Sequence, residues 1–238
     1  IGKGTACVLA GHGATVYVTG RTVEEGRHEL PGTLGATVAE VNARGGKGVA
    51  VPLDLEDDTS IAAGFDRVAR DEGRLDILVN NAMAIPPAMT SRAGFWEKPL
   101  DEELQILDTG LRAVFAASWH AARIMVPQGS GLIASMSGYV GVTYTYDVAF
   151  GTAKSGVDRM MRDMGVELKG SGVTALSLWQ GFTFTERATE NLRKVEGMAS
   201  QLNSAAGARP EVPGRGRAPV AGDPPGTPED RRGLRQTG

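Results

Sequence analysis

Ser137, Phe150 and Lys154 are candidate functional residues because of their types and their spacing. A serine hydroxyl can donate a hydrogen bond to a carbonyl oxygen. Lys154 follows Phe150 by one helical turn, so the two side chains are expected on the same side of a helix. A phenyl ring cannot donate a proton, so position 150 offers no general acid. The plainer alternatives are a loop serine without a role and a solvated surface lysine.

Alternating helix-like and strand-like segments predict an α/β fold, a doubly wound parallel sheet of Rossmann-like type with helices on both faces. Helices are expected at residues 3–11, 33–44, 58–72, 100–126 (stopped near Pro127), 148–169 and 185–202, and strands at 14–19, 48–53, 75–80, 131–136 and 173–178. A βαβ unit begins with a strand, yet this chain begins inside a helix. No later segment has the pattern of a closing strand, so the first central strand and the last strand are expected to be missing.

A change of composition near Ala205 divides the chain into a predicted domain of residues 1–204 and a tail of residues 205–238. The tail is rich in Gly, Pro and Arg and contains only three larger aliphatic residues. Such a segment cannot bury enough apolar surface to offset its ordering entropy. It is therefore predicted to be disordered.

Composition and charge exclude several classes of function. A formal net charge of -3 gives no basic footprint for nucleic acid, and no apolar run approaches the length of a membrane span. The single cysteine, Cys7, allows no internal disulfide, which fits a reducing compartment, and a cytoplasmic location is expected. His12, His28 and His120 lack metal-ligand spacing, so no metal site is predicted.

The segment from Phe150 to Val157 resembles the active-site helix of the short-chain dehydrogenase/reductase (SDR) family, whose signature is Tyr-x-x-x-Lys. Ser137 lies 13 residues before Phe150, which suits the catalytic serine of that family. The string Asn80-Asn81-Ala82-Met83 is similar to the family's Asn-Asn-Ala-Gly. The resemblance covers about residues 1–200 and is closest to the dehydrogenase/reductase member 1-like branch. Residues 18–21, 95–99 and 177–179 are the grounds for that branch.

The resemblance implies a nucleotide site in the first third of the chain. Ile1 and Gly2 correspond to the last two positions of the family's loop Thr-Gly-x-x-x-Gly-x-Gly, where glycine lets the backbone approach the pyrophosphate. Arg21 stands at the end of the second strand, where an acidic residue would indicate NAD. An arginine there could pair with a 2′-phosphate, so NADP is expected, and a solvated turn arginine is the alternative. Asp54 corresponds to the aspartate beside the adenine ring, with a helix-capping role also open.

Further cofactor contacts are implied by the same resemblance. Asn81 would brace the sheet and the cofactor through its amide. Lys154 would hold the nicotinamide ribose. Thr183 would contact the nicotinamide carboxamide through its backbone, and Thr185 would do so through its hydroxyl.

Four positions depart from the family pattern. Phe150 replaces the catalytic tyrosine and Met83 replaces a glycine. Gln180 replaces a proline in the carboxamide loop. Gly110 aligns with the asparagine that organises a proton-relay water, so the relay is in doubt as well.

The resemblance implies an NADP-dependent oxidoreductase that transfers hydride to or from a small carbonyl or alcohol, impaired by Phe150. One alternative is a non-catalytic module that binds the cofactor or a partner. Another is a fragment, truncated at its start. A homodimer or homotetramer is expected through the helices at 100–126 and 148–169. Because the family's first strand is central, the sheet is also expected to be broken between the strands at 14–19 and 75–80.

Overall fold

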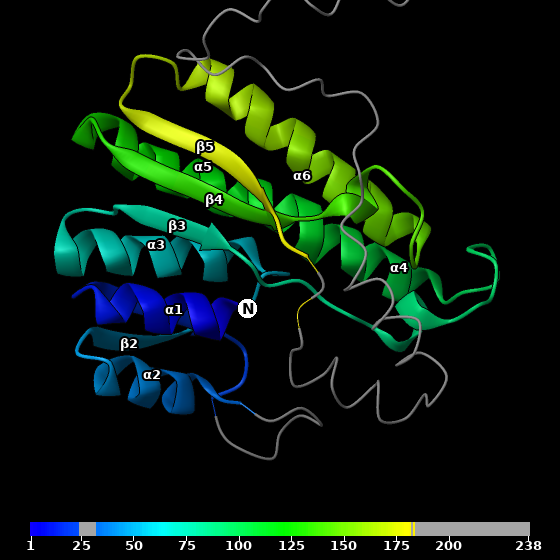
Figure 1. Ribbon diagram of the computed structural model, residues 1–238, viewed down its shortest axis with the longest axis horizontal. Coiled ribbons are helices and arrows are strands. Elements are labelled where there is room, and N and C mark those ends of the chain that lie inside the picture. Colours follow the sequence, from blue (N-terminus) through cyan, green and yellow to red (C-terminus); the bar gives the residue numbers. More distant parts are fainter. Residues whose placement is uncertain (24–31, 182, 184–238) are drawn as a thin grey trace, which may run out of the picture. The chain divides into compact units, whose positions relative to one another are not determined.

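The computed structural model describes residues 1–23, 32–181 and 183 (Figure 1). These residues belong to a unit spanning residues 1–194, and a second unit spans residues 195–238. Thr185, the predicted helix at 185–202 and the predicted tail at 205–238 lie outside the described residues. The boundary between domain and tail at 204/205 therefore stays a prediction.

Helices and strands alternate along the described part of the chain. In chain order the elements are α1 (Gly2–Gly11), β1 (Thr15–Gly20), α2 (Leu34–Ala43), β2 (Lys47–Pro52), α3 (Asp58–Glu72), β3 (Ile77–Asn80), η1 (Pro87–Thr90), α4 (Leu100–Leu107), η2 (Asp108–Arg112), α5 (Ala113–Gln128), β4 (Gly131–Ser137), η3 (Tyr139–Gly141), α6 (Val148–Glu167) and β5 (Val173–Trp179). The expected strands and helices within this range are present, most with ends shifted by one or two residues.

The strands form two parallel sheets among the described residues. β1 pairs with β2, from Thr15 opposite Lys47 to Gly20 opposite Pro52. β3, β4 and β5 pair in that order and lie side by side in Figure 1. In this part of the chain β1 and β3 are not paired with each other, which confirms the predicted break.

Local sequence explains where α3 begins and ends. The Asp57 carboxylate accepts a hydrogen bond from the Thr59 amide at 2.8 Å, which caps the first turn. The helix ends at Gly73, whose φ of 66° is left-handed and suits glycine. These two signals account for the agreement between the predicted and observed bounds.

The helix predicted at 100–126, stopped near Pro127, is not continuous. It is divided into α4 and α5 by a turn of π-helix, η2, from Asp108 to Arg112. Its end agrees with the prediction to two residues: α5 includes Pro127, ends at Gln128 and is capped by Gly129, which has a φ of 75°. A proline removes one backbone donor, and so close to the helix end this loss does not stop the helix before the glycine does.

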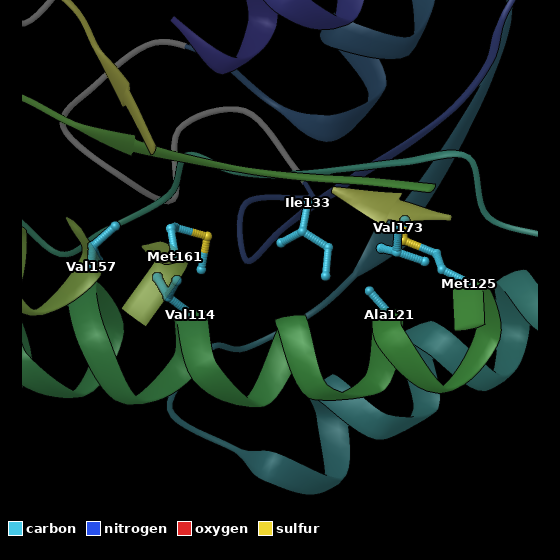
Figure 2. Close-up of a cluster of buried hydrophobic side chains, with 7 residues drawn as sticks. All are labelled: Val114, Ala121, Met125, Ile133, Val157, Met161 and Val173. Atoms are coloured by element: carbon cyan, nitrogen blue, oxygen red, sulfur yellow. The ribbon is translucent and has the colours of Figure 1, made fainter. Parts of the chain in front are cut away.

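The main core lies between β4, β5 and the helices α5 and α6. Figure 2 shows Val114, Ala121 and Met125 of α5 directed toward Ile133 of β4. Met161 of α6 is buried in the same cluster, with Met160 and Met164 packed against it. The methionine group on α6 therefore serves packing, as its polarizable side chains suit.

Candidate functional site

A cavity of about 190 Å³ opens at the carboxyl ends of β1, β2 and β3. Its walls come from these strand ends, from the loop after β3 and from α3, η2 and α5. In open parallel sheets, ligands bind in the crevice outside the carboxyl ends of the strands. Arg21, Asp54 and Asn81, three of the predicted cofactor residues, line this cavity together.

Gly2 lies directly against Asn81. A Cβ atom built on Gly2 would stand 2.7 Å from Nδ2 of Asn81, closer than a side chain allows. Gly2 is the first residue of α1, and Ile1 before it makes no side-chain cap. The first amides of α1 thus lie beside Asn81 with only glycine between them, which suits the approach of an anion to the helix N-terminus.

Arg21 is paired with an acid that the sequence reading did not include. Its guanidinium lies 3.7 Å from a carboxylate oxygen of Glu56, and both side chains are partly exposed. The same Glu56 oxygen accepts a hydrogen bond from the Gln105 amide at 2.6 Å. A 2′-phosphate at Arg21 would have to compete with this carboxylate. No sequence motif indicated Glu56. It lies in the loop after β2, and only the fold brings this loop close to Arg21.

Asp54 does not cap the following helix, so that structural alternative is wrong. Its carboxylate accepts a hydrogen bond from the Glu56 amide at 3.0 Å, a local turn. Asp57 occupies the capping position of α3. Asp54 remains at the edge of the cavity, where its role in a nucleotide site stays a prediction.

Asn80, rather than Asn81, makes the hydrogen bonds that brace the end of β3. Its amide donates to the hydroxyls of Ser118 at 3.1 Å and Ser135 at 3.0 Å, which join β3 to α5 and β4. The sequence predicted that Asn81 would brace the sheet, and no such bond is seen for it in the described residues. Ser135 is fully buried in this network, so its role is structural.

Ser137, Phe150 and Lys154 are brought together at the end of β4. The Ser137 hydroxyl donates to the backbone oxygen of Lys154 at 3.3 Å. The Lys154 ammonium donates to the backbone oxygen of Met136 at 2.8 Å and lies 5.8 Å from the centre of the Phe150 ring. Burial lowers the pKa of Lys154, and the negative charge of Asp158 only partly offsets this effect.

Two of the departures from the family pattern contact each other. Gly110 is buried in η2, and a Cβ atom built there would stand 2.8 Å from the Met83 sulfur and 3.3 Å from Cβ of Ala153. Met83 and Phe150 both pack against the buried cluster of Met89, Ile106 and Ala149. The Met83 side chain therefore fills the space that a residue larger than glycine would need at position 110.

Residues around the predicted carboxamide loop are more exposed than Ser137, Phe150 and Lys154. The Thr183 hydroxyl bonds to the backbone oxygen of Gly181 at 3.2 Å, and Gln180 faces solvent. Tyr146, which precedes α6, packs edge-on against Phe150 with ring centres 6.0 Å apart. Its phenol is thus close to position 150, although it comes from outside the helix.

Other kinds of site find little support in the described residues. No group of three or more His, Cys, Asp or Glu side chains there could hold a metal ion. His120 stacks on Phe65 with ring centres 5.5 Å apart, a packing role. None of the helices described is long and apolar enough to cross a bilayer.

The fold and the cavity define a doubly wound α/β protein of Rossmann type. A family model described as enoyl-(acyl carrier protein) reductase matches residues 1–211. The mouse and human proteins named dehydrogenase/reductase SDR family member 1 are 39% and 37% identical over 197 and 199 residues, covering 82% of this chain and 60% and 61% of those proteins. A short-chain type dehydrogenase/reductase from Mycobacterium marinum superposes with a TM-score of 0.68 at 26% identity, covering 80% of this chain and 72% of that one.

The chain belongs to the short-chain dehydrogenase/reductase family, and its similarity supports the dehydrogenase/reductase member 1-like branch. It spans 60% and 61% of the length of the two mammalian relatives.

Proposed function

We propose that this chain binds NADP and is an impaired oxidoreductase for a small carbonyl or alcohol. The observation that carries the proposal is the grouping of Arg21, Asp54 and Asn81 around one cavity, with Gly2 against Asn81. These residues fit the cofactor because the N-terminus of α1, which begins at Gly2 beside Asn81, favours an anion such as a pyrophosphate. When bound, the nicotinamide supplies or accepts the hydride.

The protein's own residues would then position the reactants. Lys154, held by the Met136 carbonyl, carries donors for ribose hydroxyls. The Ser137 hydroxyl can turn from the Lys154 backbone oxygen toward a substrate oxygen. Phe150 has no proton to give, so the oxygen of a reduced carbonyl lacks its positioned acid. A lost general acid costs typically 10²–10⁴ in rate, and positioning alone leaves a smaller acceleration.

A second candidate function is a binding module without turnover. The contact between Met83 and Gly110 favours it, because apolar side chains fill the region where the family places a polar relay. Calorimetric titration with NADPH and an assay of ketone reduction discriminate the two. Binding with slow turnover supports the enzyme, binding without turnover supports the module, and no binding overturns both the enzyme and a module that binds this cofactor.

A substitution of Arg21 tests whether the chain prefers NADPH over NADH. Replacing Arg21 with Gln should weaken NADPH binding about tenfold and leave NADH binding unchanged, because a charge-assisted bond is worth about 1.5–3 kcal/mol and Glu56 already competes for this guanidinium. Arg44→Gln, at an exposed residue after α2, is the control. Equal weakening for both cofactors would contradict a 2′-phosphate contact.

Self-association is proposed through α5 alone, rather than through both helices expected from the sequence. Val114 and Met161 are buried in the core and cannot reach a second copy. Phe115 and Trp119 are about half exposed on α5, and the Arg123 guanidinium lies 4.6 Å from the centre of a Trp119 ring. Apolar side chains one turn apart on an exposed helix face suit a two-fold contact.

Light scattering at micromolar concentration should give a dimer or tetramer, and Phe115→Asp with Trp119→Ser should give a monomer. Trp96→Ser removes an even more exposed aromatic elsewhere and should leave the mass unchanged. A monomeric unmodified chain would contradict the proposal.

A further inference from the structure

A cluster of charged side chains is buried next to the candidate site but takes no part in it. Lys98, Glu103 and Asp147 have side chains that are 3%, 11% and 0% exposed. Lys98 lies in the loop before α4, Glu103 in the first turn of α4, and Asp147 immediately before α6. The Lys98 ammonium bonds to a carboxylate oxygen of Asp147 and lies 3.7 Å from Glu103.

Asp147 connects this cluster to the helix that carries Phe150 and Lys154. Its carboxylate accepts a hydrogen bond from the Phe150 amide at 3.1 Å, which caps α6. One carboxylate thus bonds both to the first turn of α6 and to Lys98 of the loop before α4. α4 and α6 also pack on each other through Ile106 and Ala149.

Burial limits the net charge that Lys98, Glu103 and Asp147 can carry together. With both acids ionised, Lys98, Glu103 and Asp147 would leave an uncompensated negative charge in a buried position, which is costly. Oε1 of Glu103 is buried and has no hydrogen-bond partner in the described residues. The Lys98 ammonium contacts a carboxylate oxygen of each acid, so the Glu103 and Asp147 carboxyls are neighbours around one cation, and a hydrogen bond between them would require one proton.

We propose that Glu103 carries a proton that it donates to Asp147, and that Lys98, Glu103 and Asp147 are positioning residues. Together they hold the first turn of α6, and with it Phe150 and Lys154, at its place against α4. The inference rests on the packing of these three residues and stands whether or not the chain binds a cofactor.

The electrostatic surroundings agree with this assignment. Burial, together with the neighbouring Asp147, raises the pKa of Glu103. Burial alone would raise the pKa of Asp147 too, but the Lys98 ammonium and the Phe150 amide outweigh it and hold that pKa below its usual range. The proton therefore belongs on Glu103 rather than on Asp147.

Few other charges face the cluster from the elements packed against it. Tyr144 faces Lys98 from the loop before α6. η1 carries no charged residue, and the charged side chains of η2, Asp108 and Arg112, bond to each other. Lys98 and Asp147 are thus the charges that govern the titration of Glu103.

The pH dependence follows from the direction of the shift. A carboxyl whose pKa is raised by folding contributes stability that is complete below its unfolded pKa and is lost as the pH rises through its folded pKa. Opening of the first turn of α6 should then become up to about tenfold more frequent per pH unit over that window. Asp147, with a lowered pKa, is ionised in both states above about pH 5 and adds no slope there.

Amide hydrogen exchange of the first turn of α6, corrected for the intrinsic effect of pH, measures this directly. Protection should fall with rising pH in the unmodified chain and stay level in Glu103→Gln, whose amide donates to Asp147 without titrating. Asp101→Asn, an exposed acid in the same turn of α4, should behave like the unmodified chain. The same pH dependence in Glu103→Gln as in the unmodified chain would overturn the proposal.

Infrared spectroscopy of the unmodified chain tests the protonation of Glu103 directly, even if the Glu103→Gln protein does not fold. A band of a protonated carboxylic acid should persist at pH 7 and shift when glutamate is labelled with ¹³C. A spectrum with only ionised glutamate at that pH would refute the protonation of Glu103. A band that shifts with labelled aspartate instead would show that the proton is on Asp147 and not on Glu103.

Discussion

Replacing Phe150 with tyrosine should raise the rate of NADPH-dependent ketone reduction by about 10²-fold or more. The substitution adds one hydroxyl to a ring that already lies 5.8 Å from the Lys154 ammonium, on the same helix face. The ammonium would lower the pKa of the new phenol, and the phenol would supply the proton that the present ring cannot. The measurement is the steady-state oxidation of NADPH with a small ketone.

Two variants separate this effect from others. Phe95→Tyr adds a phenol at an exposed position and should leave the rate unchanged. Tyr146→Phe removes the phenol nearest to Phe150 and tests whether it already serves as an acid. If the unmodified chain reduces ketones as fast as the Phe150→Tyr protein, and Tyr146→Phe abolishes that activity, the acid is Tyr146 and the proposed defect does not exist.

Replacing Gly110 with asparagine should lower the free energy of unfolding by about 1–3 kcal/mol, the usual cost of overpacking a filled site. The new side chain would meet the Met83 sulfur, since even its Cβ would stand 2.8 Å away. Urea denaturation of the single variants Gly110→Asn and Met83→Gly and of the double variant measures the coupling.

In the double variant most of the lost free energy of unfolding should be recovered. This recovery corresponds to an interaction energy of about 0.5–3 kcal/mol between positions 83 and 110. Gly4→Asn, on α1, where an added Cβ meets nothing within 4 Å, is the matched control. It should show only the small gain in helix propensity of asparagine over glycine. Additive effects of Gly110→Asn and Met83→Gly would show that the two positions are not packed against each other.

Much of the fold could be predicted from the sequence because its signals are local. Asp57 and Gly73 define α3, and short apolar runs define the strands. The π-turn at Asp108–Arg112 could not be predicted: Gly110 is the only glycine between Leu100 and Gln128, but an isolated glycine in a helical pattern does not indicate a π-turn. It is adopted where Gly110 packs closely against Met83 and Ala153.

The candidate site was only partly predictable. Motif spacing identified Ser137 and Lys154, which the fold brings together. Glu56 beside Arg21, and Glu103 beside Asp147, were not identified because these pairs are distant in sequence and meet through tertiary packing. Asn80 was passed over for its neighbour because successive residues at a strand end point to opposite faces, and sequence alone does not say which face holds the buried serines.

The contact between Met83 and Gly110 also restricts the order in which this lineage could change. With methionine in place, an asparagine at position 110 would be selected against before it could restore any relay, so position 83 has to change first. A tyrosine regained at position 150 meets no such barrier from this pair. The two positions thus face different constraints, since an asparagine at position 110 requires a change at position 83 beforehand and a tyrosine at position 150 does not.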